Sequence, residues 1–479
     1  MGASPVTLGS VAARTALLAL WMVWLAGETE VRATMSSSTT CASESTNPLD
    51  YPNSPQRLGC LDPDYDTTED DELDEVACPT PQVGQFNNIV GKCYKAAVIG
   101  CPTAINPAGV LRDRVVLLKI SDPPAGTLER GTVVMLTGFG GAELWEDFGF
   151  DHKPSRVTDV WNVANHSAAE AVQTLNDSGY RTVQIASFPL GTELWWAADT
   201  VAALSLSHDV EQEGLRRAAC RAATVIKWVY NKYVACSDCS PSELAFGGTG
   251  NSAGASQLAY ALDEQRLGTS TGGEVFDLVV YTSGPVFQLL KQGCQTAEVI
   301  FTGTSFPGVT EPGYRRSSSA ALDTAWGEKG ATSGSNEFVG LCSKYLTTTP
   351  PANYSCPSGY NTTSVCRADT GSNDAILDAN DHVPPGATPA TYSNTVQEIL
   401  TAGDCDPNCC TQSVPCIRGD EAPGSYASID AYYDEHAAVQ SSSSLSITVD
   451  QEEQHSWNAR IKGAKKTRDT IRAKCVPRP

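Results

Sequence analysis

Apolar and polar positions alternate along residues 89–479 in a way that predicts an α/β protein. Short apolar runs predict strands, whereas longer segments with apolar side chains three or four positions apart predict helices. The predicted strands cover residues 94–100, 114–120, 131–137, 182–187, 244–246, 276–281, 363–368 and 445–449, and the predicted helices lie near 160–177, 214–235, 255–262 and 459–474. Because strands and helices alternate, we expect a mostly parallel central sheet that is flanked by helices.

Two stretches interrupt this alternation and predict insertions into a single domain that spans residues 89–479. Residues 286–360 are rich in Gly, Ser, Thr and Pro, which favours a cap over the domain. Residues 386–444 include a cysteine-dense segment, which predicts a disulfide-rich insertion. The sequence contains no tandem repeat and no linker that would divide this domain.

The N-terminal part of the chain differs from the rest in composition. Residues 1–33 contain an apolar run over 16–26 and a Val-Arg-Ala sequence that ends at Ala33, which together predict a cleaved secretory signal peptide. The apolar run is shorter than the roughly 20 residues needed to span a bilayer. Residues 34–88 form an arm with a dense acidic run over 62–75, and the mutual repulsion of these charges favours disorder.

The overall charge limits the classes of partner. The chain has 33 Lys and Arg residues against 55 Asp and Glu residues, which gives a formal net charge of −22. Nucleic acids and anionic membrane surfaces attract basic proteins, so the acidic balance argues against both as partners. With 41% hydrophobic and 18% charged residues, the chain has a globular composition. We expect a secreted protein with no stable membrane insertion after signal removal.

Seventeen cysteines and four glycosylation sequons are consistent with this secretory route. So many thiols favour disulfides in an oxidising compartment, and their odd number leaves one thiol free or bonded to a partner chain. The segment Cys236-Ser-Asp-Cys239 has no second cysteine or histidine pair nearby, so a disulfide is favoured over a zinc or redox site. The predicted glycan acceptors are Asn165, Asn176, Asn353 and Asn361.

The sequence Gly250-Asn-Ser-Ala-Gly254 carries the strongest chemical signal in the chain. It follows a predicted strand and precedes a predicted helix, which is the context of a nucleophile elbow with Ser252 at its tip. Glycines at both ends allow a sharp turn in which the serine is held in a strained backbone conformation. We therefore predict that Ser252 is a nucleophile at the carboxyl end of the sheet.

A glycine-rich segment and a late histidine supply the other groups that such a serine needs. Gly138-Phe-Gly-Gly141 follows the strand predicted over 131–137, and the backbone N–H groups of Phe139, Gly140 and Ala253 are the predicted oxyanion donors. Of the late histidines His382, His436 and His455, we prefer His455 as the base, because it lies between the last predicted strand and the last predicted helix.

The acid that orients the base is expected in a loop that follows a strand. Asp374 lies in the loop after the strand predicted over 363–368, and it is preferred over the neighbouring carboxylates. The competing positions are Asp369, Asp378 and Asp381.

The elbow at Ser252, the glycine-rich loop at 138–141 and the order serine, acid, histidine resemble the α/β-hydrolase superfamily over about residues 90–479. The resemblance implies Ser252 as nucleophile, Asp374 as acid and His455 as base, with an oxyanion hole formed by backbone N–H groups. One feature departs from the lipase and esterase pattern: no histidine begins the Gly138-Phe-Gly-Gly141 loop.

We therefore expect a serine hydrolase that cleaves small-molecule or lipid-like carboxylic esters through an acyl-enzyme, with no cofactor and no metal. A triad does not distinguish ester from amide carbonyls, so a serine peptidase of the same fold is an alternative. A catalytically silent extracellular binding protein of this fold is the non-enzymatic alternative.

Overall fold

The computed structural model describes the chain in segments. The described residues are 60–62, 74–79, 89–99, 114–138, 143–147, 167–187, 215–236, 239, 243–263, 267, 275–283, 298–300, 310–312, 346–347, 368–369, 392, 395–402, 429, 432–433, 436–439, 444–450 and 461–477. The predicted signal peptide and glycan acceptors Asn165, Asn353 and Asn361 lie outside these residues, as does most of the predicted cap.

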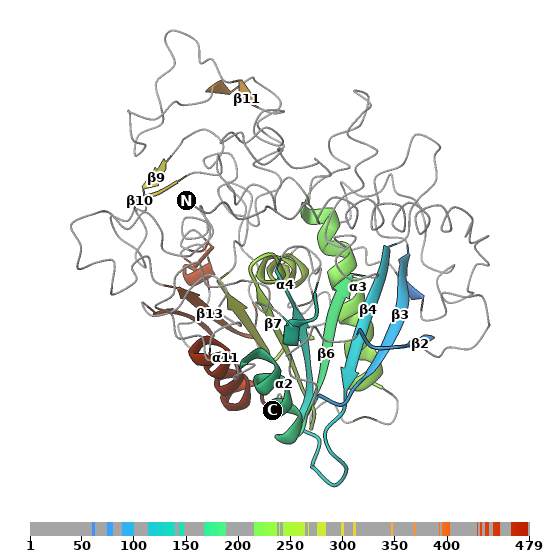
Figure 1. The fold of residues 1–479 in the computed structure, drawn as a ribbon. Helices are drawn as coiled ribbons and strands as arrows, with labels where there is room; N and C mark the ends of the chain where they lie inside the picture. The colour runs from blue at the N-terminus through green and yellow to red at the C-terminus, as the bar shows by residue number, and fades with distance from the viewer. Residues whose placement is uncertain are drawn as a thin grey trace, which may run out of the picture.

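A central sheet of ten strands organises the described part of the chain (Figure 1). Nine of its strands follow the order β1-β3-β4-β6-β5-β7-β8-β13-β14, and β2 pairs with β3 beside β1. From β6 to β14 all neighbours are parallel, whereas β4 is antiparallel to both β3 and β6. The strands are β1 (Cys60–Asp62), β2 (Asp74–Val76), β3 (Lys92–Ile99), β4 (Arg114–Ser121), β5 (Gly131–Leu136), β6 (Tyr180–Ser187), β7 (Ala245–Asn251), β8 (Leu278–Thr282), β13 (Val396–Ala402) and β14 (Leu445–Asp450).

Helices cover both faces of this sheet, as predicted. Helices α3 (Leu215–Tyr233) and α4 (Ala253–Asp263) contact each other on one face, and α2 (Ser167–Asp177) and α11 (Ile461–Lys474) contact each other on the other face (Figure 1). Alternate side chains of β5 serve the two layers: Val134 and Leu136 join the apolar cluster that includes α3 and α4, whereas Val133 and Met135 join the cluster that includes α2 and α11. Every residue of β5 is buried, as its continuous apolar sequence predicts.

The sheet differs from the prediction in one strand that matters for the site. We expected residues 363–368 to return to the central sheet, but the strand that pairs with β8 is β13 (Val396–Ala402). Within the predicted strand, Ala368 belongs to the short strand β12 (Ala368–Asp369), which pairs with β11 (Leu346–Thr347) in a separate sheet. Residues 396–402 therefore belong to the central sheet and not to the insertion predicted over 386–444.

Two short pieces of the acidic arm are ordered against the sheet, which corrects the expectation of disorder for them. Both β1 and β2 pair with β3 in antiparallel register. A disulfide joins Cys78, just after β2, to Cys93 in β3, with their Cα atoms 5.0 Å apart. The arm is thus covalently attached to the edge of the sheet.

The described residues include a second disulfide and a free cysteine. Cys236 and Cys239 form a disulfide, as predicted, and Cys475 is a free buried thiol. A separate pair of strands, β9 (Glu298–Ile300) and β10 (Thr310–Pro312), lies in the span predicted as a cap.

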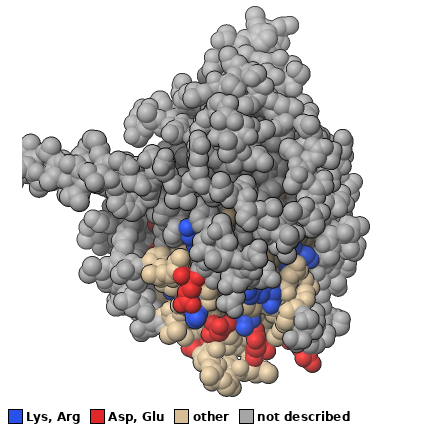
Figure 2. Space-filling model, turned by 90° about the vertical axis from the view of Figure 1, so that its right-hand side faces the viewer, with Lys and Arg blue, Asp and Glu red and all other residues tan. Residues whose placement is uncertain are grey.

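On the described surface in Figure 2, basic and acidic side chains are interspersed, and Arg181 pairs with both Asp122 and Glu129. No helix in the described part of the chain is long and apolar enough to span a membrane.

Candidate active site

Ser252 occupies the turn between β7 and α4 at the carboxyl edge of the parallel strands. Its φ is 54°, in the left-handed region that non-glycine residues rarely adopt. The Ser252 carbonyl accepts hydrogen bonds from the amides of Ala255 at 3.0 Å and Ser256 at 3.4 Å, so the helix begins immediately after the serine. The turn therefore has the strained strand-to-helix geometry of a nucleophile elbow.

Gly250 and Gly254 are the residues that make this turn sterically possible. A Cβ atom on Gly250 would lie 2.3 Å from the carbonyl oxygen of Gly254. A Cβ atom on Gly254 would lie 2.5 Å from the carbonyl oxygen of Leu136 and 2.8 Å from that of Thr137. The neighbours at both positions are backbone atoms, so a side chain could be accommodated only by moving the helix or a strand.

The elbow is also bonded to the end of the next strand, β8. The Ser252 amide donates to the carbonyl of Thr282 at 3.0 Å, and the Asn251 side-chain amide donates to the same carbonyl at 3.1 Å. In return, the Thr282 hydroxyl donates to the carbonyl of Gly250 at 3.0 Å. These three hydrogen bonds fix the elbow to the end of β8. Thr282 is fully buried, so water does not compete for them.

The residues that precede the predicted oxyanion loop lie next to this elbow. The amide of Ala253 is in the first turn of α4, where N–H groups have no partner within the helix. The contact between Gly254 and the carbonyls of Leu136 and Thr137 brings that turn against the end of β5. Phe139 and Gly140 lie outside the described residues, so their role as donors remains a prediction.

His436, one of the late histidines considered as the base, forms hydrogen bonds away from Ser252. His436 is fully buried, with Nδ1 2.9 Å from the Tyr432 carbonyl oxygen and Nε2 2.9 Å from Asp263 Oδ2. Asp263 is at the opposite end of α4 from Ser252, about 15 Å along the helix axis. Both ring nitrogens of His436 are thus engaged away from the serine. His455 follows the end of β14 by five residues and lies outside the described part of the chain.

The strand order changes the argument for the acid. Asp374 lies outside the described residues, and the strand expected before it, residues 363–368, is not among the described strands of the central sheet. The strand between β8 and β14 is β13, which ends at Ala402, and the sequence continues Gly403-Asp404. Asp404 is therefore a candidate that our sequence reasoning missed. Recognising residues 396–402 as a strand of the central sheet would have identified it.

Three partly buried carboxylates, Glu143, Glu146 and Asp147, follow the predicted oxyanion loop in the sequence. Burial, followed by the nearby charge of Glu146, raises the pKa of Asp147 to about 7. Lys119 acts in the opposite direction and lowers this pKa. Asp147 therefore titrates near neutral pH, in the short helix η3 (Trp145–Asp147) that follows the loop.

One predicted modification site is incompatible with the structure. Asn176 is 3% exposed, and its side-chain nitrogen, to which a glycan would be attached, donates to the carbonyls of Ser121 and Tyr180 at 2.9 Å. The sequon at Asn176 is therefore not a glycan acceptor in this fold. No group of three His, Cys, Asp or Glu side chains among the described residues could hold a metal ion.

The architecture and the elbow together define the α/β-hydrolase fold. No family model and no curated protein sequence matches the chain. The solved structures that resemble it include Est1E from Butyrivibrio proteoclasticus (8% identity, 75% of this chain and 93% of that chain covered, TM-score 0.32). They also include a dienelactone hydrolase from Anabaena variabilis (10% identity, 80% of this chain and 96% of that chain covered, TM-score 0.32). A third is the Francisella virulence factor BioJ (12% identity, 81% of this chain and 84% of that chain covered, TM-score 0.37). Such remote likenesses carry no information about substrate.

Proposed function

We propose that this chain is a serine hydrolase that cleaves carboxylic esters through an acyl-enzyme intermediate. The observation that carries the proposal is the backbone of Ser252, which has a φ of 54°. The turn around it requires glycine at positions 250 and 254, because a Cβ atom at either position would clash with backbone atoms. A non-glycine residue in this conformation costs about 1–3 kcal/mol. Strain of this kind concentrates at functional sites.

The chemistry follows from the groups proposed around the serine. Ser252 Oγ attacks the ester carbonyl carbon while His455 accepts its proton, and the negative oxygen is bound by the backbone N–H groups of Ala253, Phe139 and Gly140. His455 then returns the proton to the leaving alcohol. A water molecule then attacks the acyl-enzyme carbonyl while His455 accepts its proton. His455 returns this proton to Ser252 Oγ as the ester bond to Ser252 breaks, which releases the carboxylic acid product and regenerates the serine.

Labelling with a fluorophosphonate probe tests the nucleophile directly. We expect the probe to modify Ser252 in the full chain, and Ser252→Ala to lose both labelling and ester turnover. A matched control is Ser256→Ala, because Ser256 is fully buried one helical turn further along α4. Ester hydrolysis that persists in Ser252→Ala would refute the proposal.

The acid can be assigned by comparing two isosteric variants. The sequence proposes Asp374, whereas the observed strand order favours Asp404, because parallel strands end at the same edge and Asp404 follows β13 by two residues. Replacing the true acid with Asn should lower kcat about 10⁴-fold through loss of the correct histidine tautomer. The other Asp→Asn variant should keep wild-type kcat. His455→Ala should abolish turnover.

The substrate class is tested by comparing acyl esters with peptides. We expect short and medium acyl esters to be hydrolysed faster than peptides of any length. Preferential cleavage of peptides would favour the peptidase alternative, and absence of any reaction with an active-serine probe would favour the binding protein. The disulfides Cys78–Cys93 and Cys236–Cys239 support the proposal that the mature chain is secreted, and glycosylation at the remaining sequons is proposed from the sequence alone.

A further inference from the structure

The paired residues Asn251 and Thr282 end the parallel ladder between β7 and β8, directly before the elbow. They are partners in register, and both are fully buried. The next residue, Ser252, turns out of the strand with a φ of 54°, far from the negative φ of regular strands. The regular ladder therefore stops at this pair, and the two side chains supply hydrogen bonds that hold its end.

Both side chains lie on the face of the sheet opposite α4. Side chains alternate between the two faces along a strand. Gly250 faces α4, because a Cβ atom there would lie 2.3 Å from the Gly254 carbonyl oxygen, so Asn251 faces the other way. In β8, Val280 belongs to the apolar cluster of α2 and α11, and Thr282 lies on the same side two residues later. The elbow is thus held by the backbone of α4 on one face and by the Asn251–Thr282 pair on the other.

The hydrogen bonds of the pair form one connected chain. The Asn251 amide nitrogen Nδ2 donates to the Thr282 carbonyl at 3.1 Å and lies 3.3 Å from the Thr282 hydroxyl oxygen. That hydroxyl donates in turn to the Gly250 carbonyl at 3.0 Å. A hydroxyl has one proton to donate and two lone pairs to accept, so both of its bonds can form together. The pair therefore needs an amide at position 251 and a hydroxyl at position 282.

These bonds fix the two peptide groups that flank Asn251. The Gly250 carbonyl belongs to the peptide group before Asn251, and it accepts from the Thr282 hydroxyl. The Ser252 amide belongs to the peptide group after Asn251, and it donates to the Thr282 carbonyl at 3.0 Å. The orientation of this second peptide group sets φ of Ser252 and the direction of its Cα–Cβ bond. A strained φ persists only where its surroundings hold it in this way.

We propose that Asn251 and Thr282 are positioning residues for the nucleophile: they hold the peptide groups before Ser252 and so fix the position of Ser252 Oγ. The inference rests on the proposed hydrolase function. Misplacement of a reacting atom by about 1 Å lowers the rate by roughly 100-fold. Because both side chains are buried on the face away from α4, they act through the backbone of Ser252, and the binding of an ester does not depend on them.

The test measures kcat, KM and the rate constant of fluorophosphonate labelling in two variants. The substrate is an ester with a poor leaving alcohol, for which acylation limits turnover and KM reports binding. Thr282→Val is isosteric and removes the hydroxyl, and Asn251→Ala removes the amide donor. We expect each variant to lose about 10- to 100-fold in kcat and in labelling rate, with KM changed less than about threefold.

Two further variants show whether the pair acts as a unit. Thr282→Ser keeps the hydroxyl and should restore kcat to within about threefold of the wild-type value. Combining Asn251→Ala with Thr282→Val should lower kcat by less than the product of the two single losses, because residues that share one set of hydrogen bonds are not additive.

The matched control for Thr282→Val is Thr395→Val. Thr395 is also fully buried, and its hydroxyl donates to a backbone carbonyl on the neighbouring segment, that of Phe276, at 2.8 Å. This bond lies before the start of β8 and β13, at the edge of the sheet opposite Ser252. Thr395→Val should therefore lower the urea midpoint as Thr282→Val does, and keep kcat and the labelling rate.

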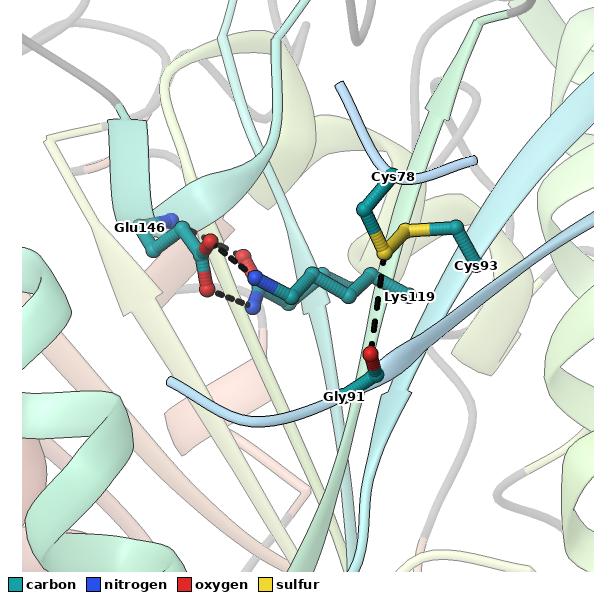
Figure 3. The surroundings of a disulfide bond; sticks show 6 residues. Cys78, Gly91, Cys93, Lys119 and Glu146 are labelled. Atoms are coloured by element: carbon teal, nitrogen blue, oxygen red, sulfur yellow. Dashed lines mark hydrogen bonds and ion pairs between the residues drawn. A yellow bond between two sulfur atoms is a disulfide. The ribbon is translucent and has the colours of Figure 1, made fainter. Parts of the chain in front are cut away.

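The disulfide between Cys78 and Cys93 supplies a control for lost stability alone. It lies at the edge of the central sheet, on β3, with three strands between β3 and β7 (Figure 3). Replacing both cysteines with serine should lower the urea midpoint and leave kcat and the labelling rate unchanged. A variant can thus be less stable without being slower.

The outcomes distinguish this inference from the proposed function. If wild-type protein hydrolyses esters but Thr282→Val and Asn251→Ala lose no more kcat than Thr395→Val, the pair has only a structural role and the inference is wrong. A rise in KM with unchanged kcat would also overturn it. If Asn251→Ala does not fold, Thr282→Val and Thr282→Ser decide the question. Wild-type protein that fails to label or hydrolyse would refute the hydrolase proposal and the inference together.

Discussion

Replacing Gly254 with alanine tests whether the contact between α4 and β5 sets up the site. The added Cβ would lie 2.5 Å from the Leu136 carbonyl oxygen, about 0.9 Å short of the 3.4 Å at which ordinary contact begins. Because the obstacle is backbone, either α4 or the end of β5 must move. Overpacking of this kind costs about 1–3 kcal/mol of folding free energy. A displacement approaching 1 Å between Ser252 and the oxyanion donors lowers the rate by about 100-fold.

The assay combines urea unfolding with kcat/KM for a short acyl ester. We expect Gly254→Ala to unfold at lower urea concentration and to lose about two orders of magnitude in kcat/KM. The matched control is Gly126→Ala, where φ is +87° and no atom lies within 4 Å of the added Cβ. That change costs about 1–2 kcal/mol through backbone strain alone and should leave kcat/KM unchanged. Equal activity in the two variants would refute the reasoning.

Three further predictions concern Asp147, Asn176 and the Cys78–Cys93 disulfide. Asp147→Asn should flatten the pH dependence of the free energy of unfolding. Because the pKa of Asp147 is raised to about 7 in the folded state, its stabilisation of the fold is fully present below about pH 4 and is lost as the pH rises through 7. This stabilisation amounts to at most about 4 kcal/mol. Unfolding profiles of wild type and variant that run parallel between pH 4 and 8 would contradict this. Glycopeptide mass spectrometry of secreted protein should find Asn176 unmodified, and a glycan there would show that Asn176 is accessible when oligosaccharide is transferred. Cys78→Ser with Cys93→Ser should lower the free energy of unfolding by about 3 kcal/mol, measured by urea titration, because the bridge closes a loop of about 15 residues; an unchanged midpoint would contradict it.

The parts of the fold that were predictable are those in which each strand buries both faces. Residues 131–136 and 278–282 are predominantly apolar, and both strands are buried throughout. The elbow was predictable for a different reason: its glycines are required by backbone contacts, so the motif has a direct steric cause.

The strand β13 was not predictable from its pattern, because it buries polar side chains. Gln397 accepts hydrogen bonds from the hydroxyls of Tyr281 and Tyr432, and Glu398 pairs with Lys474. These partners are distant in sequence, so a strand with Gln and Glu side by side resembles a surface segment until the fold is known. For that reason residues 363–368 were expected to be the strand before the acid, and Asp404, which follows β13 in the sequence, was not considered.

The pairing at the edge of the sheet and the burial of Asn176 both involve residues that are distant in the sequence. The strands β1 and β2 are three residues each in an acidic context, and their pairing with β3 is invisible to local pattern. The burial of Asn176 depends on its bonds to Ser121 and Tyr180, which lie on strands β4 and β6. A sequence motif states only that a residue type is present, and not whether it is accessible.

The central claim is that Ser252 becomes acylated during turnover. Rapid quenching of the wild-type chain with an ester that deacylates slowly, followed by peptide mass spectrometry, measures this intermediate. We predict a mass increase equal to the acyl group on the peptide that contains Ser252, and none in Ser252→Ala. Steady ester hydrolysis with an unmodified Ser252 peptide, under conditions in which deacylation limits the rate, would contradict the account.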